Sequence, residues 1–264
     1  MLAQKLGLSL PTIKKVGGAA AFENLYSIEF IGPTRNIKYS DSDEFTINNS
    51  GANRGMSWSF WIKTIHSRTD LFDKFGTSGS EWAFRVGKSG TLEFYIYGND
   101  SSVLSQALIT DSSAGSFIDI ADGNWHHIVG IYDLGNTSSS LKLYIDNVQF
   151  SQGVGALYFS LGSPWIASTN TAQDMFFGGV SGNFKGNADE IAIFDSALSA
   201  SEVSDIYNSG VPNDVSVIPH LKGWWRNGDP NGTAAFPTIE DESSNSNNGI
   251  MNGMLSSDIV TDVP

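Results

Sequence analysis

The stretch Ser57-Trp58-Ser59-Phe60-Trp61-Ile62 carries three aromatic side chains and contains neither glycine nor proline. Aromatic and β-branched residues are enriched in strands, and large side chains at both odd and even positions indicate a strand that is covered on both faces. A second stretch, Thr91–Tyr97, alternates polar and apolar residues between Gly90 and Gly98. The two stretches therefore predict a β-sheet protein whose short strands end at glycine turns.

Further short runs of this kind occur along the chain. We predict strands at residues 26–30, 71–75, 82–86, 126–132, 141–145, 191–194 and 221–225. Asp146 and Asn147 directly follow one of them, and both residue types tolerate positive φ, so they suit a two-residue hairpin turn. Strands at this spacing with glycine turns between them predict a β-sandwich.

One short helix interrupts the strand pattern. Ser199 and Glu202 form a capping box, in which the serine oxygen accepts an unpaired amide and the glutamate reaches back. Apolar residues at 203, 206 and 207 then give one helical face. We predict that the helix ends with Gly210 as the residue after its C-cap.

The composition limits the classes of partner. The chain of 264 residues has a net charge of −13 and no cysteine. The negative charge argues against binding to nucleic acid or to an anionic membrane surface, and it is consistent with either calcium binding or solubility alone. Disulfides and thiolate metal sites are excluded. No apolar run reaches 18 residues, and the N-terminal residues do not resemble a signal peptide.

Residues 1–21 differ from the rest of the chain. They hold Lys5, Lys14 and Lys15 and no acidic residue, with apolar side chains such as Leu10 and Ile13 between the lysines. We predict an arm that attaches to a larger assembly through these five residues, followed by a sandwich domain over residues 22–264. A free terminus is the alternative.

Five stretches resemble one known family in their order and spacing. They are residues 27–32, 45–62, 122–130, 141–148 and 184–195. Together they are similar to the LamG-like jelly-roll family of the concanavalin A-like lectin/glucanase superfold. The resemblance implies an all-β fold, an antiparallel jelly-roll β-sandwich with one short capped helix.

The chain departs from the family pattern at its C-terminal end. A strand of the kind with which family domains often open occurs here as Gly223-Trp224-Trp225, and the turn that usually follows it resembles residues 241–249. About 50 residues are too few for a second sandwich. We therefore expect the segment 219–264 to complete the same sandwich. Trp224 and Trp225 are adjacent, so one should face inward and one outward.

The resemblance also suggests that loops of this chain bind calcium, which would be its only cofactor. Pentraxins and laminin-type G modules bind calcium on loops at a sandwich edge, with carboxylate, amide and carbonyl oxygens. The matching loops here contain Asp70 and Asp174, with Asn170 or Gln173 nearby. These two aspartates are the expected ligands.

Sugar binding would use exposed aromatic rings and hydrogen-bonding amides. Trp82, Tyr158 and Trp165 lie near predicted loops, and Asn170 is close in sequence. We expect these four residues at a carbohydrate site if one exists. Trp58, Trp61 and Trp125 lie within strand patterns and are expected in the core.

No catalytic residue is expected. Asp189 and Glu190 would point to opposite faces of a regular strand, and Asp189 and Asp195 would lie about 20 Å apart, beyond the separation of a glycosidase carboxylate pair. His126 and His127 are neighbours on one strand, so they cannot both bind one ion from a regular strand. We expect one buried and one surface histidine ring.

The chain also resembles structural proteins of marine tailed phages. Our main prediction is a non-enzymatic virion protein, a capsid decoration or a tail appendage, with virion proteins as partners and an oligomeric state on the particle. Cell-surface glycans are further candidate partners. The alternative is a secreted carbohydrate- or calcium-binding adhesion module located outside the cell. Nucleic acid and membranes are not expected as partners.

Overall fold

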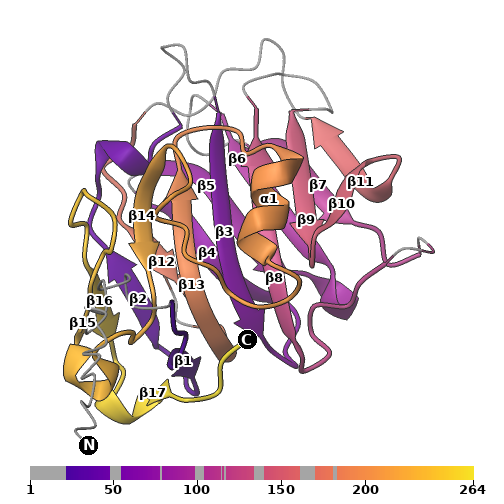
Figure 1. Cartoon of the computed structure of the whole chain (residues 1–264). Helices are drawn as coiled ribbons and strands as arrows, with labels where there is room; N and C mark the ends of the chain where they lie inside the picture. Colours follow the sequence, from indigo (N-terminus) through magenta and orange to yellow (C-terminus); the bar gives the residue numbers. More distant parts are fainter. Residues whose placement is uncertain are drawn as a thin grey trace, which may run out of the picture.

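The structure is a computed structural model that describes residues 22–47, 55–77, 79–98, 104–113, 115, 117–133, 140–160, 170–180 and 183–264, with the backbone alone for 104–106 and 158–160. Two sheets pack face to face, and one helix, α1, lies outside the first sheet (Figure 1). The predicted fold class is confirmed: the chain is a nearly all-β sandwich with one α-helix among its described residues.

The first sheet has a strand at its centre that is paired on both sides. This strand, β13, pairs with β3 on one side, and with β1 and then β14 on the other. In spatial order the sheet contains β17 (Ile259–Val260), β1 (Ser27–Phe30) end to end with β14 (Leu221–Trp225), β13 (Gly186–Phe194), β3 (Met56–Lys63), β8 (Trp125–Tyr132), β9 (Leu141–Ile145) and β10 (Val148–Gln152).

The second sheet is assembled mainly from hairpins. Its order is β15 (Thr238–Ile239), β16 (Gly249–Asn252), β2 (Asn36–Tyr39), β12 (Met175–Phe177), β4 (Thr69–Gly76), β5 (Gly79–Val86), β6 (Leu92–Tyr97), β7 (Leu104–Thr110) and β11 (Gly155–Ser160). Short 3-10 turns lie at Asp43–Phe45, Lys88–Gly90, Gly232–Ala235 and Ser256–Asp258.

Aromatic side chains fill the space between the sheets. Trp58 of β3 has no exposed surface and packs against Trp82 and Phe84 of β5, with ring centroids 5.0 and 5.6 Å apart. Phe60 meets Phe84 edge to face at 5.4 Å. Such offset contacts add to the free energy gained by burial, and this explains why β3 carries aromatic residues at its inward positions.

The C-terminal segment contributes strands to both sheets. β14 pairs with β13, β16 with β2, and β17 with β1. Trp225 lies in the main core, with its ring 4.3 Å from that of Tyr39. Trp224 lies on the opposite face, where it is 5% exposed because a second apolar cluster covers it. The two indoles therefore face opposite ways, and both are buried.

The predicted helix is α1 (Ala200–Tyr207), and its capping box is confirmed: the Glu202 amide donates to the Ser199 hydroxyl, and the Glu202 carboxylate accepts from the Ser199 amide. Its apolar residues Val203 and Ile206 pack on the outer face of the first sheet. The prediction for its end was wrong, because the left-handed C-cap is Asn208, before Gly210. No helix in the described part of the chain is long and apolar enough to cross a membrane.

Candidate functional site

The outer face of the second sheet carries a group of aromatic residues. On β6, Leu92, Phe94 and Ile96 point into the core, and alternation sends the intervening residues outward. Tyr95 and Tyr97 are thus on the outer face, together with Phe75 of β4 and Arg85 of β5, which interact with them. We call Asp70, Asp73, Phe75, Arg85, Tyr95 and Tyr97 the aromatic face.

Tyr95 stands between two small residues. Its cross-strand partners are Ala83 on β5 and Ala107 on β7, so methyl groups flank the ring on both sides. The Tyr95 side chain is half-buried, and its hydroxyl donates to Glu93. Burial, followed by this hydrogen bond, raises the pKa of Tyr95. A broad ring between alanines offers an apolar surface to a flat ligand.

Arg85 supplies a charged donor beside these rings. Its guanidinium carbon lies 5.2 Å from the Tyr95 ring centroid and 5.6 Å from that of Phe75. Its Nε donates to Oδ1 of Asp70 at 2.7 Å. The ion pair and the rings hold the guanidinium in place, while a third of the side chain stays exposed. Nitrogens of this group can therefore donate to a ligand.

Asp73 is the most unusual residue of the face. It is 4% exposed, and its Oδ1 has no hydrogen-bond partner among the described residues. Burial, and then the nearby Asp70 carboxylate, raise the pKa of Asp73 well above its usual value, although Arg85 lowers it. A buried acceptor without a partner is costly, and protonation of the carboxyl, which the raised pKa favours, reduces that cost.

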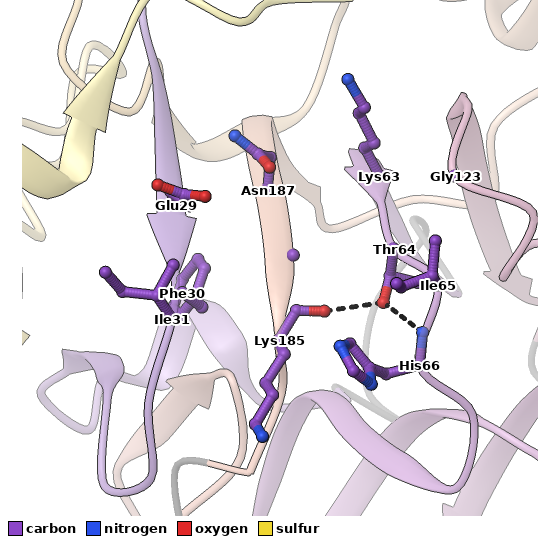
Figure 2. Close-up of a pocket in the computed structure, with 11 residues that line it drawn as sticks. Glu29, Phe30, Ile31, Lys63, Thr64, Ile65, His66, Gly123, Lys185 and Asn187 are labelled. Carbon is purple, nitrogen blue, oxygen red and sulfur yellow. Dashed lines mark hydrogen bonds between the residues drawn. The ribbon is translucent and has the colours of Figure 1, made fainter.

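A second candidate is a groove of about 340 Å³ at one end of the first sheet. Figure 2 shows a polar row across three strands: Glu29 of β1, Asn187 of β13 and Lys63 of β3. These residues are register neighbours, Glu29 with Asn187 and Asn187 with Lys63. The row places an acceptor, an amide and a donor side by side.

The groove has a rigid floor and an apolar rim. The Thr64 hydroxyl donates to the Lys185 carbonyl at 2.6 Å and accepts from the His66 amide at 3.0 Å (Figure 2). Ile31 and Ile65 are 56% and 71% exposed. Phe30 is the only Phe, Tyr or Trp of the lining and is 1% exposed. The other ring is the exposed imidazole of His66, so this groove offers hydrogen bonds but no exposed phenyl or indole ring.

The structure describes only some of the predicted sugar-binding residues in full. The prediction for Trp82 was wrong: its ring is fully buried, and its indole donates to the Phe45 carbonyl at 3.2 Å. Asn170 accepts from the Thr46 hydroxyl at 3.1 Å and donates to Asp43. Tyr158 lies on β11, where its backbone pairs with Leu108. Trp165 lies outside the described residues.

The predicted calcium ligands are engaged elsewhere. Asp70 pairs with Arg85, and Asp174 pairs with Lys38 at 2.6 Å. Within the described ranges, no group of three or more His, Cys, Asp or Glu residues could hold a metal ion. Calcium at Asp70 and Asp174 stays a prediction, as does the assembly arm, because Lys5, Leu10, Ile13, Lys14 and Lys15 lie outside the described residues.

Asp189 and Glu190 form a buried acidic pair. Glu190 has a φ of 45°, and the register of β13 shifts between Asp189 and Ala192. Burial raises the pKa of Glu190 to about 7; burial and the Glu190 charge raise that of Asp189 well above its usual value. Glu190 accepts from Trp224 Nε1 at 2.6 Å and is 5% exposed. The pair is enclosed, so it is a poor candidate for glycoside hydrolysis.

The expectation of one surface histidine was wrong. His126 is 6% exposed and lies between Asp146 (2.7 Å) and Asp122 (3.1 Å), which hold its pKa above the usual value despite burial. His127 is fully buried, and its Nε2 lies 2.8 Å from the Ser59 hydroxyl. Both rings therefore have structural partners.

The comparisons with known proteins agree with this architecture. The Laminin_G_3 family model, described as the concanavalin A-like lectin/glucanases superfamily, matches residues 39–204, more than half of the chain. The chain belongs to the concanavalin A-like lectin/glucanase superfamily. The predicted LamG-like fold is thereby confirmed, whereas the phage resemblance is not tested by this match. No curated protein matches the sequence.

Several solved structures are similar to this chain. A candidate carbohydrate binding protein from Bacteroides ovatus is 13% identical, with a TM-score of 0.51; the match covers 92% of this chain and 62% of that protein. A heptameric SAP-like pentraxin from Limulus polyphemus is 18% identical, with a TM-score of 0.45; the match covers 69% of this chain and 82% of the pentraxin chain. The sialyllactose-bound CBM40 of a Ruminococcus gnavus sialidase is 12% identical, with a TM-score of 0.44; the match covers 70% of this chain and 96% of the CBM40 chain.

The aromatic face was missed at the level of sequence, although a signal for it existed. In Thr91–Tyr97, the residues that alternate with the core positions include two tyrosines. Large aromatic residues on the outer side of a strand do not fill the core between the sheets, and this pattern favours a binding surface. The alanines beside Tyr95 come from other strands, and only the register of the sheet brings them there.

Proposed function

We propose that this protein is a non-enzymatic carbohydrate-binding module that holds its ligand on the aromatic face. The observation that carries the proposal is the placement of Tyr95 between Ala83 and Ala107, with Arg85 beside its ring. A sugar ring has apolar faces and a polar edge, and it needs a flat apolar surface with donors and acceptors around it.

The surrounding groups supply the polar contacts. Arg85, a third of whose side chain is exposed, donates to ligand hydroxyls. Asp70 holds Arg85 in position. Membership of a superfamily described by lectins and glucanases supports the same class of ligand.

The test is affinity electrophoresis against soluble polysaccharides, followed by calorimetry with the best ligand. Tyr95→Ala should weaken binding at least about fivefold, the effect of losing a stacking contact of about 1 kcal/mol. Ala107→Leu keeps the tyrosine but covers its flank, and it should weaken binding by a similar factor.

The groove of Figure 2 provides the matched control. Lys185→Met changes an exposed residue of that groove and should leave binding unchanged. Loss of binding in Lys185→Met with full binding in Tyr95→Ala would move the site to the groove. Release of reducing sugar from a bound polysaccharide would contradict the non-enzymatic assignment.

The finer prediction, a virion protein of a tailed phage that displays this module, is a separate proposal supported by sequence resemblance alone. The alternative, a secreted carbohydrate- or calcium-binding adhesion module, has the better support for its carbohydrate-binding part, because the superfamily match favours that class of ligand. Mass spectrometry of washed phage particles separates the two locations: peptides from residues 22–264 are expected in particles under the virion proposal, and their absence would overturn it.

A further inference from the structure

Basic side chains without an acidic partner gather at one end of the sandwich. Among the described residues, the lysines and arginines that form no ion pair are Arg68, Lys88, Lys142 and Lys185. All but Lys142 lie around the connection from β3 to β4: the Thr64 hydroxyl donates to the Lys185 carbonyl, and the Arg68 amide donates to the carbonyl of Gly87, which precedes Lys88. In a chain with a net charge of −13, unpaired cations at one place favour the approach of an anion.

The groove of Figure 2 lies at this end, and the backbone around it fixes the position of Lys185. The next residue, Gly186, has a φ of 141°, and a Cβ atom there would lie 2.2 Å from the Lys63 carbonyl oxygen. Glycine therefore allows β13 to approach β3 this closely. The Thr64 hydroxyl is engaged as donor and as acceptor, and the Thr64 carbonyl accepts from the Gly123 amide at 2.9 Å. Thr64 thus orients the groove, and ligand binding falls to the neighbouring side chains.

The side chains of the groove divide into two ends. In Figure 2, the Lys185 ammonium and the His66 imidazole lie on one side of the hydrogen bond between Thr64 and Lys185, and the polar row described above lies on the other side. Lys185 and His66 are exposed, and neither side chain has a partner among the described residues. An ammonium carries three donors, and an imidazole carries at least one N–H in either neutral form. This end therefore offers donors that await an acceptor.

The charges of the groove limit its ligand to one negative charge. The Lys63 ammonium pairs with Asp262 at 2.7 Å, so Lys185 carries the available positive charge. Glu29, in the polar row, would repel a second anionic group. Two further acids near the connection already accept hydrogen bonds within their own turns, namely Asp119 and Asp122. One ammonium and one imidazole match the two oxygens of a carboxylate, whereas a phosphate group presents three strong acceptor oxygens and a higher charge.

Two exposed isoleucines form apolar rims beside this cationic end. Ile31 and Ile65 are 56% and 71% exposed, and in Figure 2 they lie on opposite sides of Lys185. A hydrocarbon tail between them would remove apolar surface of both residues from water, which is favourable. The groove volume of about 340 Å³ is near the lower limit of ligand sites, about 300–1,000 Å³. The ligand is therefore small.

We propose that this groove binds a small aliphatic carboxylate, with the carboxylate at Lys185 and His66 and the hydrocarbon tail between Ile31 and Ile65. The polar row at the far end limits the length of the tail, because a longer tail would bury Glu29 without a hydrogen bond. A sugar fits less well, since the groove has no exposed phenyl or indole ring. The site belongs to the first sheet and is separate from the aromatic face of the second sheet.

The experiment is a calorimetric titration of the full chain with sodium octanoate at neutral pH. Octanoate should bind at one saturable site. Octanamide keeps the tail without the charge and should bind about fivefold more weakly, the upper range for an exposed ion pair; acetate lacks the tail and should bind at least about tenfold more weakly. Lys185→Met keeps a linear side chain without the charge and should weaken octanoate binding about fivefold. Ile65→Ser should weaken it by a similar factor.

Lys88→Met and Val217→Ser are the matched controls. Lys88 is an exposed lysine outside the groove lining, and Val217 is 75% exposed, close to the value for Ile65. Both variants should leave octanoate binding unchanged. The absence of saturable heat with octanoate would overturn the proposal, and so would equal affinities for octanoate and octanamide. Equal weakening in Lys185→Met and Lys88→Met would also overturn it, as would binding of a short aliphatic peptide with a free C-terminus but not of octanoate.

Discussion

Lys74 and Glu81 form an ion pair of 2.8 Å in which neither side chain has any exposed surface. The ammonium of Lys74 also contacts Asp41 and the Thr46 hydroxyl, each at 2.9 Å. Glu81 accepts in addition from the amide and hydroxyl of Thr171. This network connects the β4–β5 hairpin to residues 41–46 and to residue 171.

Glu81→Gln should destabilise the protein by about 3 kcal/mol, because it leaves a buried ammonium without its nearest counter-charge. Urea unfolding measures the change. Asp174→Asn breaks the partly exposed pair with Lys38 and should cost less than about 1 kcal/mol. Equal losses of unfolding free energy in the two variants would show that the buried Lys74–Glu81 pair stabilises the protein no more than the partly exposed Lys38–Asp174 pair.

Trp225→Ala tests the closure of the sandwich by β14. The ring packs on Tyr39 and Phe45, and its indole donates to the Asn247 carbonyl at 2.9 Å. Truncation should cost about 3–5 kcal/mol, measured by denaturant unfolding. Val217→Ala, at a side chain that is 75% exposed, should stay within about 0.5 kcal/mol. An unaltered midpoint in Trp225→Ala would refute the closing role of β14.

The helix cap gives a smaller and more local effect. Ser199→Ala removes the acceptor for the Glu202 amide and should cost about 1 kcal/mol. Ser201→Ala, at an exposed position two residues further along, is the matched control and should be close to neutral. A difference below the error of the measurement between the two variants would argue against the capping box as a source of stability.

His127 should make the protein sensitive to acid. Burial lowers its pKa to about 3, whereas the unfolded chain has an ordinary value near 6.5. Between about pH 6.5 and 3 the unfolded state binds the proton and the folded state does not. The free energy of unfolding therefore falls with falling pH, by up to about 1.4 kcal/mol per unit from this residue. Above pH 6.5 the effect is absent.

The measurement compares urea unfolding of the wild type and His127→Gln at pH 7.5, 6 and 5. Glutamine keeps a hydrogen-bonding group near Ser59 and does not titrate. The free-energy difference between the two proteins should shrink as the pH falls. Parallel pH profiles would mean that His127 accepts a proton in the folded protein at an ordinary pH.

Local signals predicted the helix and many of the strands, whereas no strand was predicted at β2, β7, β10, β11 or β12. Alternation placed the strand at 92–97 correctly, the capping box located the start of α1, and the turn at Asp146 and Asn147 adopts the expected positive φ at both residues. The predicted helix end was wrong because Asn208, Ser209 and Gly210 all have positive φ. The first of them ends the helix.

The candidate sites depend on register, which the sequence does not display. A bulge gives Glu190 a left-handed conformation and breaks the alternation that would have set it opposite Asp189. Trp82 was expected near a loop, but β5 continues past it, and the residue faces the core. The order of residues along the chain does not reveal that Ala83 and Ala107 lie beside Tyr95. Nor does it reveal that Asn24 lies beside Asp189.

The pairing of β2 with β16 can form only late in biosynthesis. Asn36 and Asn252 are register partners separated by 216 residues. At a synthesis rate of about 5–20 residues per second, roughly 10–40 seconds pass between the two strands leaving the peptidyl-transferase centre. During that time β2 offers an unpaired edge to any neighbouring nascent chain. Ribosome-associated chaperones that cover exposed strands should therefore raise the yield of this protein more than they would for a sandwich closed by consecutive hairpins.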